Sequence, residues 1–123
     1  MYAGFAANFA SYRLWSSIAS LVFALARRKD IPQYDATLRH LKERLEQAGE
    51  GHYLEYTRYY EAQALFQGDV EAWGKWNELL VRSIKTAQQA DGSIQSQFGP
   101  ELGTSMSLLA LALNYRFLPI YER

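Results

Sequence analysis

Two kinds of helix-forming segment alternate along this chain, and their alternation constrains the fold more than any other feature. No sustained stretch alternates apolar and polar residues with the period of a strand, and β-branched residues are sparse. We therefore expect an all-α fold of about five helices. The predicted helices cover residues 9–27, 33–48, 52–67, 69–89 and 103–117.

The first, third and fifth of these segments are apolar, aromatic or small on nearly every side, whereas the second and fourth carry a single apolar stripe. A helix that is apolar all round must be surrounded by protein, while a helix with one stripe lies on a surface. The sequence thus predicts three inner and two outer helices. The predicted stripes are Leu38, Leu41 and Leu45 in the second helix, and Trp73, Trp76, Leu80, Ile84 and Ala87 in the fourth.

The breaks between the helices are mostly short, and helices joined by short loops run antiparallel. The chain is expected to form one helical domain over residues 1–123, built from two antiparallel inner–outer pairs and a further inner helix. A shift of about forty residues lays the end of the second helix over the end of the fourth, a period that suits an array of helix pairs.

The stretch from Gln88 to Ile94, QQADGSI, has the residue types of a helix end followed by a tight turn. A glutamine amide, from Gln88 or Gln89, can satisfy a helix-end carbonyl, and Gly92 after Asp91 can take a positive φ. The stretch resembles the QW motif, Q-x-x-D-G-S-W, of the squalene and terpenoid cyclase and prenyltransferase repeat. Ile94 stands where that family has tryptophan, so stacking of the glutamine on an indole is lost.

Two further stretches resemble uncharacterised bacterial members of that family, which we take to be non-catalytic. Residues 59–66 and 73–77 look like a YYxxQ…W-xx-WN segment, and residues 103–106 and 115–121 like a closing G-T-(S/A)-M…YR-x-L-P-x-Y segment. The resemblance implies an (α/α) toroid. A complete toroid needs roughly 250 to 300 residues at typical helix and loop lengths. We therefore expect a partial toroid: a fragment, a shortened descendant, or a protomer whose inner face another chain covers.

The chemistry of that family has no counterpart in these residues. The cyclases use a D-x-D-D cluster and the protein prenyltransferases a zinc site with Asp, Cys and His, but the acidic residues here are scattered and there is no cysteine. His40 and His52 are far apart and lack ligand spacing, and no nucleophile motif is present. We expect no catalytic residue, no metal and no cofactor, so the sequence favours a protein that is not an enzyme.

One constellation on the third helix leaves two interpretations open. Tyr53, Tyr56, Tyr59, Tyr60 and Glu61 lie close together on one predicted helix. In the cyclases, aromatic residues on inner helices line a cavity for an apolar isoprenoid, so the resemblance implies a surface for such a ligand. The alternative is that the tyrosines are core or interface residues with hydroxyls at the wet edge.

The charge balance and the apolar segments bear on partners. Thirteen basic and thirteen acidic residues give a net charge of zero, which argues against nucleic-acid binding. The apolar run from Leu14 to Ala26 is too short to cross a bilayer, and its positive cluster follows it instead of preceding it as in a signal peptide. A cytoplasmic location is favoured, although the sequence leaves the compartment open.

Two classes of function follow from these observations. The first is a non-catalytic helical scaffold or interaction module, present as a homo-oligomer or as a subunit of a larger assembly. An apolar inner layer in a chain of this length, without net charge to oppose contact, favours association. The second is a fragment or subunit of an isoprenoid-binding or isoprenoid-converting enzyme. The ligand, the pathway and the partner are not determined by the sequence.

Overall fold

Helices make up all the regular structure in the computed structural model, which describes residues 2–43, 45 and 53–114, with side chains from Tyr12 onward. The prediction of an all-α fold with about five helices is confirmed. The helices are α1 (Tyr2–Leu25), α2 (Pro32–Lys42), α3 (Leu54–Gly68), α4 (Val70–Ala87) and α5 (Pro100–Leu111), and a short 3-10 helix, η2 (Ala112–Asn114), follows α5.

Two helices begin several residues earlier than the sequence pattern predicts, and α2 begins one residue earlier, at Pro32. α1 starts at Tyr2 because the residues before position 9 include several alanines, which favour helix. α5 starts at Pro100, a residue suited to the first helical turn, directly after Gly99 with φ 104°. The N-cap position is Gly99, so Thr104 and Ser105 lie inside the helix and do not cap it. The predicted helix ends at residues 46–48 and 115–117 lie outside the described residues.

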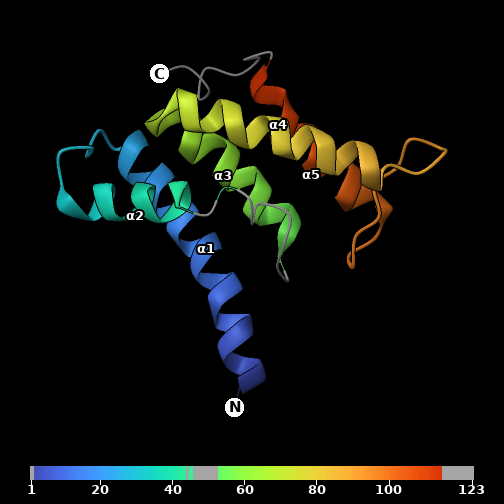
Figure 1. The fold of residues 1–123 in the computed structure, drawn as a ribbon, viewed down its shortest axis with the longest axis horizontal. Coiled ribbons are helices and arrows are strands. Elements are labelled where there is room, and N and C mark those ends of the chain that lie inside the picture. Colours follow the sequence, from blue (N-terminus) through green and yellow to red (C-terminus); the bar gives the residue numbers. More distant parts are fainter. Residues whose placement is uncertain (1, 44, 46–52, 115–123) are drawn as a thin grey trace.

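The central helix of the arrangement is α3. It packs against α1 on one side and α5 on the other, and it also contacts α2 and α4. In Figure 1, α1, α3 and α5 run in the same general direction, while α2 and α4 run back across them. The chain thus forms the pairs α1/α2 and α3/α4 and adds α5, so that α1 and α5 are the two edges of a layer centred on α3.

The outer helices bury the stripes that their period predicts, with one exception. In α2, Leu41 is fully buried and Leu38 packs against the core, as does Leu45 just beyond the end of the helix. In α4, Trp76, Leu80 and Ile84 belong to the core and Trp73 packs against it, whereas Ala87 is exposed at the end of the helix. Ala87 therefore does not belong to the buried stripe, since α4 ends there and the chain turns away.

The junction between α3 and α4 is held by Asp69. Its carboxylate accepts a hydrogen bond from the Ala72 N–H at 3.1 Å, which caps α4. The other carboxylate oxygen lies 2.6 Å from Nζ of Lys42 at the end of α2. These two contacts hold the pKa of Asp69 below its usual value. Lys29, in the α1–α2 loop, donates to the Gln67 carbonyl nearby, so one corner of the bundle joins four segments.

Two glycines make opposite demands on the packing. A methyl group at Gly103 would lie 2.3 Å from the backbone oxygen of Ile94, whereas a methyl group at Gly74 in α4 would meet nothing within 4 Å. Gly103→Ala should therefore destabilise the fold by 1 kcal/mol or more, on the order of the cost of overpacking. Gly74→Ala should stabilise it by about 0.5–1 kcal/mol, because alanine restricts the unfolded chain. Urea unfolding of both variants checks this, and equal effects would contradict the close contact at Gly103.

Candidate functional site

A buried carboxylate connects three helices. Glu61, on α3, is 0% exposed. One of its oxygens accepts a hydrogen bond from the indole N–H of Trp76, on α4, at 2.9 Å. The other oxygen forms an ion pair with the guanidinium of Arg13, on α1. The side chain of Glu61 therefore bonds to both α1 and α4.

A second guanidinium lies beside this carboxylate. Arg58, one turn before Glu61 on α3, is buried and interacts electrostatically with Glu61 and Glu55. Its Nη2 donates to the hydroxyl of Ser83, on α4, at 2.6 Å. Burial lowers the pKa of Arg58, although the neighbouring carboxylates oppose that change. We name Arg13, Arg58, Glu61 and Trp76 the charge cluster.

Burial dominates the titration of Glu61. It raises the pKa of this carboxyl above its usual value of 4.5, because the charged form loses its hydration inside the bundle. The charge of Arg13, the hydrogen bonds from Arg13 and Trp76, and the charge of Arg58 all act in the opposite direction and do not cancel the effect. A carboxyl with a raised pKa could serve as an acid. Glu61, however, exposes no surface and already holds Trp76 and Arg13, so in this conformation it offers no proton to an external substrate.

Glu61 differs in exposure from the tyrosines with which the sequence analysis grouped it. Tyr53 and Tyr56 are 42% and 37% exposed, while Tyr59 and Tyr60 are half-buried. Tyr60 packs against the core, and its ring lies edge-on to that of Tyr59 with centroids 5.1 Å apart. The four tyrosines therefore follow α3 from the core to the surface, and Glu61 lies on the inner side and not on a shared surface.

Sequence reasoning missed Arg13, Arg58 and Trp76 as partners of Glu61. One signal was available, because Arg13 is the sole charged residue within α1. A charged residue in an otherwise apolar helix is rarely buried without a partner. The sequence interpretation used Arg13 only to limit the apolar run, since a single sequence does not say which carboxylate a buried arginine meets.

The glutamine-rich stretch forms a turn held by four local side-chain hydrogen bonds. The Gln89 side chain donates to the carbonyl of Ala87, the last residue of α4, at 3.2 Å. The Gln88 side chain reaches over the turn to the Gly92 carbonyl at 3.0 Å, and Gly92 has φ 90°. The Asp91 carboxylate accepts from both the N–H and the hydroxyl of Ser93, which lowers the pKa of Asp91.

Ile94 anchors this turn to α5. Its side chain belongs to the hydrophobic core, and its N–H donates to the hydroxyl of Thr104 at 2.9 Å. The turn thus fixes the start of α5 against the end of α4. Every contact in it stabilises the connection, and the arrangement has the character of a structural turn.

Large apolar side chains are exposed on both edge helices. On α1, Trp15 is 63% exposed, and Tyr12 and Val22 are exposed on the same face of the helix. On α5, Leu108 is 62% exposed and Leu109 is exposed beside it. Figure 1 also shows the N-terminal half of α1 extending beyond the other helices. α3, between the two edges, buries most of its side chains. Among the helices that the structure describes, none covers these exposed side chains of α1 and α5.

An apolar groove runs between α4 and α5. It has two adjoining parts with volumes of about 950 Å³ and 230 Å³, and both parts are lined by Val81, Leu108 and Leu111. The larger part extends to Ala112 and Asn114, and the smaller part extends to Lys85 and to Ile94 of the Asp-Gly turn. The two parts together place an elongated apolar surface along the outside of the bundle.

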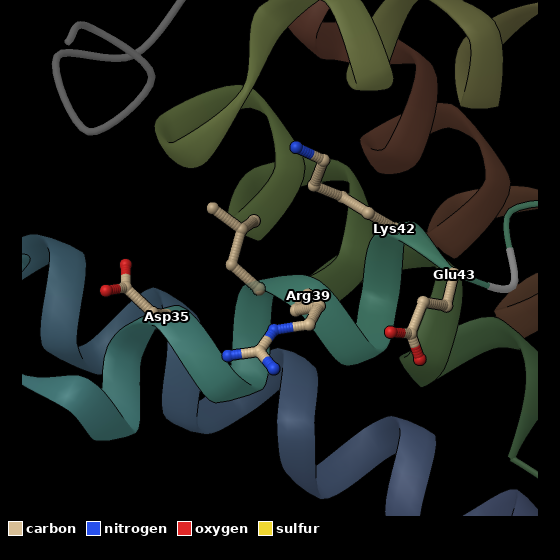
Figure 2. Close-up of a pocket in the computed structure, with 5 residues that line it drawn as sticks. Asp35, Arg39, Lys42 and Glu43 are labelled. Carbon is tan, nitrogen blue, oxygen red and sulfur yellow. The ribbon is translucent and has the colours of Figure 1, made fainter.

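A second groove, of about 460 Å³, lies along α2. Figure 2 shows Asp35, Arg39, Lys42 and Glu43 spaced along the helix, with Lys42 extending away from it. Two acidic and two basic side chains line it together with Leu38. Lys42 is already paired with Asp69. Because its charges balance and Lys42 is already paired, we interpret this groove as part of the solvated surface of the outer helix α2.

The described residues contain no group of His, Cys, Asp and Glu that could hold a metal ion. His40 lies on α2, and His52 lies outside the described residues. Over the same part of the chain, no helix combines the length and hydropathy needed to cross a bilayer.

No protein-family model, curated protein or solved structure matches the chain at a significant level. The resemblance to the cyclase and prenyltransferase repeat therefore rests on the sequence motifs alone. The charge cluster, the exposed edges of α1 and α5, and the α4–α5 groove are the features on which a function can be argued.

The raised pKa of Glu61 has a consequence for stability. The folded chain keeps a proton on this carboxyl at pH values where the unfolded chain has released it, so the contribution is fully present below pH 4.5 and is lost as the pH rises through the folded-state value. Wild-type stability should therefore fall, relative to that of Glu61→Gln, as the pH rises above 4.5. Urea unfolding of both proteins across this pH range measures the difference between their free energies of unfolding. Both proteins contain the same two histidines, so the contribution of these residues cancels in the difference. A constant difference would contradict the assigned direction.

The turn after α4 makes a separate prediction. Gly92→Val forces a β-branched residue into a positive φ and should cost about 1–2 kcal/mol. Gln89→Ala removes the hydrogen bond to the Ala87 carbonyl and should cost up to about 1 kcal/mol. Gln95→Ala, at an exposed position beyond the turn, serves as the control and should have no effect. Thermal and urea unfolding compare the three, and unchanged stability in both turn variants would contradict a structural role.

Proposed function

We propose that this chain is a non-catalytic helical interaction module that associates with further copies of itself through the apolar face of α1. The observation that carries the proposal is the exposed row of Tyr12, Trp15 and Val22 on a helix whose N-terminal half extends beyond the bundle. Exposed aromatic and aliphatic side chains that share one face of a helix are typical of protein interfaces.

The energetics of α1 support this interpretation. The N-terminal half of α1 extends beyond the other helices, so its own backbone hydrogen bonds are its main support (Figure 1). Short helices are marginally stable in water without packing. A partner helix on the exposed face would supply that packing. The net charge of zero gives little electrostatic repulsion between copies.

The charge cluster fixes the orientation of α1, and so it also fixes the face that α1 would present to a partner. Arg13 is held by Glu61 on the inner side of α1, while Tyr12 and Trp15 lie on the outer side. The ion pair fixes the rotation of α1 about its axis, because a turn of the helix would take the arginine away from its carboxylate. The outer face is thereby presented in one orientation.

The family resemblance supports the same class of function. In its sequence motifs the chain resembles a helix-pair repeat of the cyclase and prenyltransferase type, in which inner helices pack side by side. α1, α3 and α5 are packed in that order here, with exposed apolar side chains on the first and last. Repeats of this kind bury their faces by stacking further helices against them. The acidic and metal-binding residues of the catalytic members have no counterpart in the sequence, and so the proposal is for an assembly role.

The proposal is tested by the mass of the protein in solution. Sedimentation equilibrium at micromolar concentration should give a species heavier than 14.1 kDa. The double change Trp15→Glu and Val22→Glu should shift it to the monomer with unchanged helix content, because both residues are exposed and their substitution costs the fold little. Ala36→Glu, at an exposed position on α2, is the matched control and should leave the mass unaltered. A wild-type protein that stays at 14.1 kDa throughout would overturn the proposal.

A further inference from the structure

The α4–α5 groove differs from the exposed face of α1 in how its polar groups are arranged. Its walls are formed by Val81, Leu108 and Leu111 along the whole length, with Ile84 and Ile94 toward one end. The groove follows α5 and η2 from Thr104 to Asn114, which is about 15 Å at the rise of an α-helix. The groove is therefore elongated, and its middle part is lined by apolar side chains.

Several polar side chains that line the groove are already hydrogen-bonded within the protein. The Ser107 hydroxyl donates to the Gly103 carbonyl at 2.7 Å, and the Thr104 hydroxyl accepts from the Ile94 N–H. At the far end, Asn114 exchanges hydrogen bonds with Asn77 at 3.1 and 3.2 Å. These groups close the ends of the groove and have little hydrogen-bonding capacity left for a ligand.

Lys85 is the exception. Among the described residues that line the two parts of the groove, it carries the one full charge, and no carboxylate lines the groove beside it. It lies in the last turn of α4, at the end of the groove that meets the Asp-Gly turn. A cation at one end of an apolar channel selects a molecule with an anionic head and an apolar tail.

We propose that the α4–α5 groove binds a single-chain amphiphile with a carboxylate head, the head at Lys85 and the tail along Val81, Leu111 and Leu108. The length of the groove matches an extended chain of roughly ten to twelve carbons, at the bond lengths and helix rise that apply here. A docked helix would require polar partners along both sides of its path, whereas the polar groups here are grouped at the ends.

The proposal commits to a carboxylate amphiphile and not to a second copy of the chain. The groove lies on α4 and α5, while the association proposed above uses α1, so the two sites are distinct. Binding at the groove can therefore fail without affecting self-association, and the reverse also holds.

Calorimetric titration with decanoate, below its micelle concentration, tests the site. The wild-type protein should bind decanoate saturably with a stoichiometry of one per chain, and it should bind decanol more weakly. Lys85→Met, which keeps an apolar stem but removes the charge, should weaken decanoate roughly fivefold, the value of an exposed ion pair, and leave decanol unchanged. Leu108→Asp should weaken both ligands roughly tenfold or more, because an exposed apolar wall becomes charged.

Lys75→Met is the matched control, since Lys75 lies on the same helix, outside the groove lining, and pairs with Glu71. It should bind decanoate as the wild type does. Absence of saturable binding, or equal affinities in the wild type, Lys85→Met and Leu108→Asp, would overturn the proposal. A change in the mass of the protein on Leu108→Asp with no change in decanoate affinity would also overturn it, because a second copy would then occupy the groove.

Discussion

The contact between Glu61 and its partners is the interaction on which the rest of the bundle depends. A carboxylate inside an apolar bundle is costly unless its charge is paired and its oxygens are hydrogen-bonded. Arg13 supplies the opposite charge from α1, and Trp76 supplies a hydrogen bond from α4. These two bonds fix the rotation of both helices relative to α3. Removing Arg13 would leave the Glu61 carboxylate buried without its ion pair, which is more damaging than losing the contact alone.

The position of α3 at the centre of the contacts explains why apolar side chains are exposed on α1 and α5. α3 is surrounded because α1, α2, α4 and α5 all pack against it. α1 and α5 each have α3 on one side, and their other side carries exposed residues such as Trp15 and Leu108. An array of helices that is fastened at its centre leaves its apolar surface at its ends, where a further helix or a ligand can add to it. The proposed association through α1 and the proposed amphiphile groove beside α5 both follow from this geometry.

The two edges nevertheless differ in kind. α1 presents a convex row of aromatic and aliphatic side chains, which suits another protein surface. α5 shares a groove with α4, and the Asp-Gly turn places Lys85 and Ile94 at one end of it. The turn therefore has a second consequence beyond the connection between helices, since it shapes the end of the groove. The local chemistry of Gly92 and Ser93 thus affects the proposed binding surface through the position that it gives to Ile94.

The sequence by itself determined the features that depend on near neighbours in the chain. The period of the leucines in α2, the tryptophan stripe in α4 and the turn residues Asp91 and Gly92 each act within a few positions, so a local pattern predicts them. Tertiary structure alone decided that Arg13 meets Glu61, that α3 is central while α1 and α5 are edges, and that Val81 and Leu108 line one groove. The reason is physical: whether a charge or an apolar side chain is buried depends on residues that folding brings from distant positions, and the local pattern carries no information about which ones they are.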